Sequence, residues 1–114
     1  PPIIDIAAGR RVICHFHDTR GLGLANVAAA LETGVRAFDS SLAGLGGCPF
    51  APGATGNINT EDTAFMLESM GFATGIDIGA LLELRRDVES WLGDERYSGA
   101  IARAGLPKTY QPVA

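Results

Sequence analysis

Residues 11–41 read RVICHFHDTRGLGLANVAAALETGVRAFDSS, and this stretch decides the fold class. Arg11–His17 is apolar on both alternating faces at its start, which is typical of a strand covered on two sides in a parallel sheet. Leu22–Thr33 carries apolar residues at helical spacing and ends before Gly34, a residue type that commonly follows a helix. Val35–Ser41 is a second short strand candidate. Together they predict an α/β fold with one βαβ unit, in which two parallel strands are joined by a helix packed on the sheet.

The first nine residues predict the end of a helix that precedes this unit. Ile3, Ile4 and Ile6 are spaced as in a last helical turn, and Gly9 is suited to stop it. Nothing caps the start of this turn, as if the chain began within an element. No basic stretch followed by an apolar one is found here, so a secretory signal is not expected.

Ala43–Asn59 is rich in glycine and is predicted to form a long loop. A structureless loop of this length is uncommon in a compact domain and is usually functional or disordered. Thr60 is the predicted N-cap of a helix that stops near Gly71.

A further helix is predicted to begin after Asp77 and to run to about Leu92. Its apolar positions fall on one stripe, namely Leu81, Leu84, Val88 and Trp91. Its charged residues should form a solvated face, and they are Glu83, Arg85, Arg86, Asp87 and Glu89. Residues 93–114 form a tail with few periodic features.

Composition excludes several classes of protein. The 114 residues are 46% hydrophobic and 19% charged, which is typical of a packed globular chain and not of a disordered one. The net charge of −4 excludes a broad basic surface for nucleic acid or anionic lipid. The longest uncharged apolar stretch, around Leu22–Leu31, is far shorter than the roughly 20 residues that span a membrane. Two cysteines make no disulfide framework, so a reducing, cytoplasmic setting is expected.

The pair His15-x-His17 is the sharpest candidate for a metal site. Two residues apart on a strand, both imidazoles project from one face with Cβ atoms about 6–7 Å apart. Imidazole binds divalent transition metals, and mixed nitrogen and oxygen sites accept Mn²⁺ or Mg²⁺. The alternative is a pair of strand-end histidines that bond backbone or solvent. Their place at the carboxyl end of a parallel strand favours the metal site, because ligands bind there in α/β folds.

Two residues of the long loop could also carry chemistry. Cys48 could reach a ligand as a reactive thiol, or could serve as a small buried apolar residue. Asn57 could offer its carbonyl oxygen to a metal, or could form an ordinary turn after Gly56. The glycines Gly44, Gly46 and Gly47 give only a weak phosphate-loop signal, without the Lys-Ser/Thr of a P-loop.

Two carboxylates follow the predicted strands. Asp18 and Asp39 could each orient a histidine from behind, or could cap the turn that follows. Cys14 alternates away from the histidines and is expected to pack against a helix.

Four motifs resemble one family: HFHDT at 15–19, DSSLAGLGGCP at 39–49, GATGN at 53–57 and TED at 60–62. Together, from about residue 10 to residue 92, they resemble the C-terminal part of 3-hydroxy-3-methylglutaryl-CoA lyases. His-x-His with a later Gly-Asn also occurs in Claisen-type synthases and 4-hydroxy-2-oxovalerate aldolases. The Gly-Leu-Gly-Gly-Cys-Pro loop resembles the lyase branch in particular, and Ala104–Thr109 is similar to its bacterial members.

The resemblance implies a (β/α)₈ TIM barrel, of which this chain supplies the last two βα units and the C-terminal helices. Residues 1–9 would end a preceding helix, 10–92 would hold the two units and the following helix, and 93–114 would form the tail. Such a barrel takes about 200–250 residues, so 114 residues cannot close one alone. A homodimer is common in families of this kind.

The resemblance also implies a reaction, the cleavage of 3-hydroxy-3-methylglutaryl-CoA to acetyl-CoA and acetoacetate. A divalent cation, Mg²⁺ or Mn²⁺, would be held by residues that match His15, His17 and Asn57. It would chelate the carboxylate and C3 hydroxyl of the acyl-CoA substrate. Cys48 matches the loop cysteine that would protonate the product enolate, and His15 matches a histidine considered as a proton carrier.

The chain departs from the family pattern in ways that leave alternatives open. No segment matches the first-strand Asp ligand and its neighbouring Arg, and Arg20 stands where the family often has Tyr. The isolated chain is therefore expected to be unstable or inactive unless a partner supplies the other strands. The alternatives are a lyase for another 3-hydroxyacyl-CoA, an acyl-CoA synthase, a 4-hydroxy-2-oxovalerate aldolase, or a non-catalytic fragment.

Overall fold

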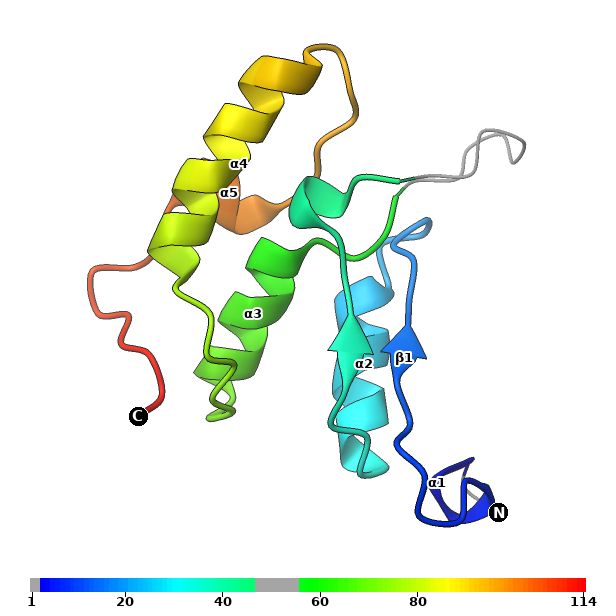
Figure 1. The fold of residues 1–114 in the computed structure, drawn as a ribbon. Coiled ribbons are helices and arrows are strands. Elements are labelled where there is room, and N and C mark those ends of the chain that lie inside the picture. The colour runs from blue at the N-terminus through cyan, green and yellow to red at the C-terminus, as the bar shows by residue number, and fades with distance from the viewer. Residues whose placement is uncertain (1–2, 47–55) are drawn as a thin grey trace.

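A two-stranded parallel sheet and its crossover helix form the centre of the structure, a computed structural model that describes residues 3–46 and 56–114. Strand β1 (Cys14–His15) pairs with β2 (Phe38–Asp39), with Cys14 opposite Phe38 and His15 opposite Asp39. Helix α2 (Gly23–Glu32) joins the two strands and lies along one face of the pair (Figure 1). The predicted βαβ unit is therefore confirmed.

The paired strands are much shorter than predicted. Regular pairing covers two residues in each strand, where the sequence predicts strands over 11–17 and 35–41. Isolated bridges extend the pairing, antiparallel between His17 and Asn57 and parallel between Ser41 and Asn59. A strand needs a hydrogen-bonded neighbour, and the described residues supply β1 and β2 with each other alone.

Within residues 3–46 and 56–114, only one face of the sheet is covered. The core beneath α2 consists of the buried residues Val27, Leu31 and Ile58. Partly buried apolar side chains pack against this core, and they are Phe16, Phe38, Met66, Leu67 and Phe72. On the opposite face, Ile13 is 56% exposed and both histidines are exposed. The prediction of a strand buried on two sides is therefore wrong, because no described segment packs on the histidine face.

The other elements are helical. The first is α1 (Ile3–Ile6), a single turn where the sequence predicts a helix end. The rest are η1 (Leu42–Gly44), α3 (Thr60–Ser69), α4 (Ile78–Leu92) and α5 (Ala100–Ala104). Helices α2, α3 and α4 end or begin close to their predicted positions. The turn η1 begins one residue before the predicted loop, and α5 lies within the predicted tail. Periodicity indicated neither, because both are too short to show a pattern.

Helix α3 is capped one residue earlier than predicted. The side chain of Asn59, not Thr60, accepts a hydrogen bond from the backbone N–H of Asp62 at 2.8 Å. Thr60 is the first helical residue, and its hydroxyl bonds that of Ser40 at 2.7 Å. At α4 the predicted start after Asp77 is confirmed, and the Asp77 carboxylate caps the helix by accepting a hydrogen bond from Ala80 N at 3.1 Å.

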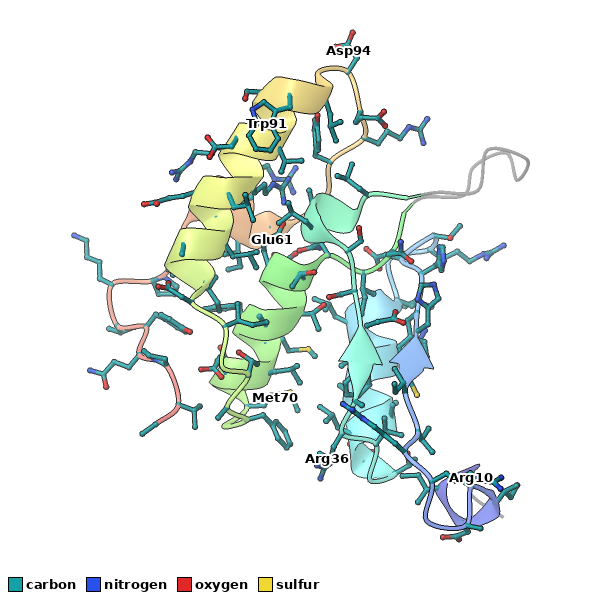
Figure 2. The ribbon with its side chains drawn as sticks, viewed as in Figure 1. Arg10, Arg36, Glu61, Met70, Trp91 and Asp94 are labelled. Atoms are coloured by element: carbon teal, nitrogen blue, oxygen red, sulfur yellow. The ribbon has the colours of Figure 1, made fainter. Side chains whose placement is uncertain are left out.

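Helix α4 turns only part of its predicted apolar stripe inward, since Leu81 and Val88 are half-buried and the other two members are exposed. Leu84 is 46% exposed and Trp91 is 72% exposed, so the predicted apolar stripe does not form a buried seam (Figure 2). Arg85, predicted on a solvated face, is only 5% exposed. Arg85 lies inward because a buried carboxylate, Glu61 of α3, meets its guanidinium.

The described chain is flat. Its extents are 45 × 41 × 20 Å and its radius of gyration is 15.0 Å, against about 13 Å for a compact domain of this length. Among residues 3–46 and 56–114, no helix is both long and apolar enough to cross a membrane.

Candidate metal centre

The two histidines converge at the carboxyl end of β1. Their Nε2 atoms lie 3.0 Å apart, and the rings meet edge to face with centroids 4.9 Å apart. Two donors at right angles on a cation about 2.1 Å from each lie about 3 Å apart, so one divalent ion can bind both nitrogens. The predicted juxtaposition of His15 and His17 is present in the structure.

Asp39 orients the first histidine. The parallel register places it opposite His15, and its carboxylate hydrogen-bonds the Nδ1 atom of that ring. A carboxylate at Nδ1 keeps the proton there and leaves the lone pair of Nε2 available for a metal. Of the two carboxylates considered from the sequence, Asp39 therefore lies behind the histidine.

Asp18 was considered either as a residue that orients a histidine or as a cap of the turn that follows, and its contact is of the second kind. Its carboxylate accepts a hydrogen bond from the backbone N–H of Gly23 at 2.9 Å, at the start of α2. A side chain at position 23 would not fit, because a Cβ there would lie 2.3 Å from Ile58. Asp18 thus contacts the helix start, and the expectation that it supports a histidine is not met by its contacts.

Asn57 brings an oxygen beside the histidines. It is bridged to His17, so the two side chains lie on one face of the sheet. Its Nδ2 donates to the carbonyls of Leu45 at 3.0 Å and Gly46 at 3.3 Å, which turns Oδ1 the other way. That Oδ1 is buried and has no hydrogen-bond partner among the described residues. A buried acceptor without a partner costs about 1–3 kcal/mol, and a cation is one ligand that would satisfy it.

The two described ends of the long loop, residues 43–46 and 56–57, form the loop stem. Glycines in this loop stem allow close packing. Gly44 and Gly46 both have positive φ, at 70° and 95°. A Cβ on Gly44 would lie 2.2 Å from the Ser98 hydroxyl, and one on Gly46 would lie 3.2 Å from Asn57 Nδ2. These glycines therefore let the loop stem approach its neighbours. Gly47 and Cys48 lie outside the described residues, so their predicted roles stay predictions.

The donor set is incomplete for a metal. Within the part of the chain that the structure describes, no group of three or more His, Cys, Asp or Glu side chains could hold an ion. His15 and His17 offer two nitrogens from exposed side chains, and Asn57, which is bridged to His17, offers one buried oxygen. This is half or less of the six ligands that Mg²⁺ takes, so other groups must complete the shell.

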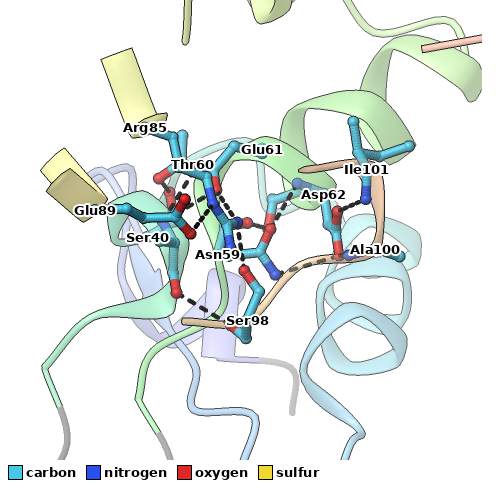
Figure 3. A network of polar contacts seen from close by, with 12 residues as sticks. Ser40, Asn59, Thr60, Glu61, Asp62, Arg85, Glu89, Ser98, Ala100 and Ile101 are labelled. Atoms are coloured by element: carbon cyan, nitrogen blue, oxygen red, sulfur yellow. Dashed lines mark hydrogen bonds and ion pairs between the residues drawn. The ribbon is translucent and has the colours of Figure 1, made fainter. Parts of the chain in front are cut away.

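A buried polar network behind the site was missed from the sequence. Glu61, fully buried, accepts from the backbone N–H of Ala43 with both oxygens, at 3.1 and 3.0 Å. Arg85 donates to Glu61 at 2.7 Å and to the carbonyl of Ser98 (Figure 3). One sequence signal existed, because Arg85 lies at helical spacing from Ile78, Leu81 and Val88, where a core residue is normally apolar.

Comparison with known proteins identifies the family. The HMGL-like family model matches residues 7–88. The chain belongs to the HMGL-like family. The hydroxymethylglutaryl-CoA lyase of Pseudomonas mevalonii is 51% identical over 92 residues, which cover 81% of this chain and 29% of that protein. The 3-hydroxy-3-isohexenylglutaryl-CoA/hydroxymethylglutaryl-CoA lyase of Pseudomonas aeruginosa is 47% identical over 98 residues, 86% of this chain and 32% of that protein.

A solved structure gives the same family and the fold. The HMG-CoA lyase from Acinetobacter baumannii, in complex with coenzyme A and 3-methylmalate, superposes with a TM-score of 0.78 at 51% identity. The match covers 90% of this chain and 33% of that one. The chain is thus a fragment of a TIM-barrel fold, as the resemblance implied, and spans about a third of the length of its HMGL-like relatives.

Proposed function

We propose that a protein carrying this chain cleaves 3-hydroxy-3-methylglutaryl-CoA to acetyl-CoA and acetoacetate with the help of Mg²⁺ or Mn²⁺. The observation that carries the proposal is the convergence of the His15 and His17 Nε2 atoms beside Asn57, which is bridged to His17 and whose Oδ1 has no partner among the described residues. Identity of 51% to a hydroxymethylglutaryl-CoA lyase supports the reaction class. Family membership supports a divalent metal without identifying the ion.

The residues at hand fit a divalent cation. His15 and His17 would hold it through Nε2 and Asn57 through Oδ1. A bound cation would act as a Lewis acid, lowering the pKa of the C3 hydroxyl of the substrate and neutralising charge in the transition state. Asp39 would keep His15 in the tautomer that leaves Nε2 free of a proton.

The chemistry then needs proton transfers at two atoms. Loss of the C3 hydroxyl proton forms the new carbonyl and breaks the C2–C3 bond, whose electron pair stays on C2 as the acetyl-CoA enolate. C2 must then gain a proton. We assign that proton to the thiol of Cys48. His15 is the proposed carrier for the hydroxyl proton, which its Nε2 would accept in a state in which that nitrogen does not bind the cation, because Asp39 hydrogen-bonds Nδ1.

A chimaeric enzyme tests this proposal. The matching segment of the Pseudomonas mevalonii lyase is replaced by this chain, and release of acetoacetate is measured with Mg²⁺ and Mn²⁺. We expect turnover that a chelator abolishes and that Cys48→Ala lowers by about 10²-fold or more. Cys14→Ala is the matched control and should retain activity, because Cys14 lies on the other strand face from the histidines. A folded chimaera without turnover, or with turnover that a chelator does not change, would overturn the proposal.

A second substrate has one observation in its favour. The Pseudomonas aeruginosa relative is named for both 3-hydroxy-3-isohexenylglutaryl-CoA and hydroxymethylglutaryl-CoA. A lyase for a longer branched 3-hydroxyacyl-CoA is therefore the second candidate. Its product would be a longer 3-oxo acid in place of acetoacetate, whereas pyruvate would indicate an aldolase and acetyl transfer to a 2-oxo acid a synthase.

We further propose that activity requires the rest of a barrel, in a homodimer within the cytoplasm. The open histidine face and the incomplete donor set support the need for the rest of the barrel. Steady lyase turnover by the 114-residue chain alone, abolished by Cys48→Ala, would contradict that need. Sedimentation of the complete enzyme tests the homodimer, and fractionation of the source cells tests the cytoplasmic location.

A further inference from the structure

The buried ion pair between Glu61 and Arg85 has no place in the chemistry proposed above. Glu61 is 0% exposed and Arg85 is 5% exposed, and their oxygen and nitrogen lie 2.7 Å apart. Two buried charges are stable only when further hydrogen bonds satisfy their remaining donors and acceptors. The partners that do so here lie on the segment that leads to the metal centre.

Ala43 is held from both sides by this network. Both Glu61 oxygens accept from its N–H, and its carbonyl accepts from the backbone N–H of Ser98 at 2.8 Å. Arg85 closes the ring, because it donates both to Glu61 and to the Ser98 carbonyl (Figure 3). Ala43 has a φ of 56°, a left-handed conformation that costs about 1–2 kcal/mol in a residue with a Cβ and persists only where neighbours enforce it.

The enforced turn sets the position of Asn57. The carbonyls of Leu45 and Gly46, two and three residues after Ala43, accept both hydrogen bonds of the Asn57 amide nitrogen. These bonds decide which way Oδ1 faces, since the amide is planar and its nitrogen is held. Contacts therefore run without a break from Glu61 through Ala43 and the loop stem to the unpartnered oxygen.

We propose that Glu61 is a positioning residue for Asn57, and that Arg85 and Ser98 extend this control to the C-terminal segment. The inference rests on the proposed function in one respect, that Asn57 is a metal ligand. Glu61 touches no reacting atom, and its carboxylate acts through the backbone of Ala43. The competing view is that the ion pair only joins α3 to α4.

A paired substitution separates the two views. Glu61→Met/Arg85→Met removes both charges and the hydrogen bonds to Ala43 while it keeps apolar volume, a change that buried ion pairs often tolerate. Glu89→Gln is the matched control, because Glu89 accepts from Arg85 Nε at 3.3 Å and does not touch the loop stem. The dissociation constant for Mn²⁺ is measured on each variant of the chimaeric enzyme described above by the EPR signal of the free ion.

We expect the paired variant to raise the Mn²⁺ dissociation constant about tenfold or more, as loss of outer partners of metal ligands commonly does, and Glu89→Gln to leave it unchanged. In an Asn57→Ala background the paired variant should have no further effect, because the ligand that it positions is gone. If the ion pair had a merely structural role, the effects of the paired variant and of Asn57→Ala on the Mn²⁺ dissociation constant would be additive. In the metal-free chain, the side-chain NH₂ signals of Asn57 should shift in the paired variant alone.

Each result decides the inference. A folded paired variant with unchanged Mn²⁺ affinity and unshifted Asn57 signals would overturn it, as would additivity with Asn57→Ala. Where Asn57→Ala itself leaves Mn²⁺ affinity unchanged, the proposed metal ligand fails, and the NH₂ signals still decide the positioning role. If the paired variant does not fold, Ser98→Pro removes the donor to the Ala43 carbonyl and is judged by the same measurements.

Discussion

Backbone contacts at the loop stem leave no space for extra atoms. A Cβ on Gly56 would lie 1.6 Å from the carbonyl oxygen of Gly44, which is backbone and cannot rotate away. The two sides of the loop stem thus touch at Gly44 and Gly56, and Gly56 directly precedes the proposed ligand Asn57.

Gly56→Ala should therefore lower the free energy of unfolding by about 1–3 kcal/mol, the range for overpacking. Gly79→Ala is the matched control, because Gly79 lies inside α4 and its Cβ would meet Asp77 at an ordinary 3.4 Å. It should raise stability by about 0.5–1 kcal/mol, since alanine favours a helix. Urea unfolding of both variants provides the measurement, and equal effects of the two would contradict the packing described.

The positions of the proposed metal ligands were easier to predict from the sequence than those of the groups that support them. His15 and His17 could be placed on one face because alternation along a strand is local. Their partner Asp39 is 24 residues away, and the sequence left it open between two roles. Glu61 and Arg85, also 24 residues apart, were missed because a buried charge is recognised only by its partner.

Between elements, the start of α3 offers a direct comparison of two capping residues. Asn59 → Ala should cost about 0.5–2 kcal/mol, because the N–H of Asp62 loses its acceptor. Thr60→Ala should cost less, since it removes one hydrogen bond between two hydroxyls, that with Ser40. Thermal and urea unfolding measure the stability of both variants. A larger loss of stability for Thr60→Ala than for Asn59→Ala would favour Thr60 as the cap, as the sequence predicts.

The carboxylate of Glu68 ties three segments together. It accepts from Thr74 N at 2.7 Å, in the α3–α4 connection, and from Val113 N at 2.9 Å, in the tail. These backbone hydrogen bonds, Thr74 first, hold the pKa of Glu68 below its usual 4.5. Nearby, burial raises the pKa of Tyr110, and the charges of Glu68 and Asp77 add to that rise.

A lowered carboxyl pKa has a defined consequence for stability. The contribution of Glu68 is present above its unfolded pKa and is lost as the pH falls through the lower folded value. The stability difference between the natural chain and Glu68→Gln should thus be largest near neutral pH and should shrink below pH 4.5. Urea unfolding at several pH values tests this, and a difference that grows on acidification would contradict it.

Element boundaries were predictable wherever a local signal fixed them. Helix α2 ends before Gly34, whose φ of 98° requires glycine, and α4 begins at the cap Asp77. The prediction of which residues of α4 face inward was wrong at Leu84 and Trp91, because the stripe was judged by apolarity alone. Helix α5 was missed because its start depends on Asp62, whose carboxylate accepts from Ala100 and Ile101 at 2.8 and 2.9 Å.

At the scale of the whole molecule, the chain exposes an apolar side chain, Ile13, on the sheet face that would line the interior of a complete barrel. Ile13 is 56% exposed on the histidine face, beside strands whose outer edges have no partner strand in the part of the chain that the structure describes. Open strand edges and apolar faces favour association. We expect the isolated chain to self-associate, and Ile13→Lys to weaken that association about tenfold, as loss of a central apolar contact does.

Leu84→Lys is the matched control for this prediction. Leu84 is also exposed, but it lies on α4, away from the sheet. Sedimentation velocity over a range of concentrations measures both variants. Equal weakening by the two substitutions would show that association is not specific to the sheet face.

The hydrogen bond between Ser98 and Ala43 also has a meaning in time. The two residues are 55 positions apart, so a ribosome adding about 5–20 residues per second completes the second roughly 3–11 s after the first. His15, His17 and Asn57 are all synthesised before the group that holds the loop stem on its far side. On a growing chain the proposed metal ligands therefore exist before their geometry is fixed, and a nascent chain released before Ser98 would carry the histidine motif without the hydrogen bonds from Ser98 to Ala43.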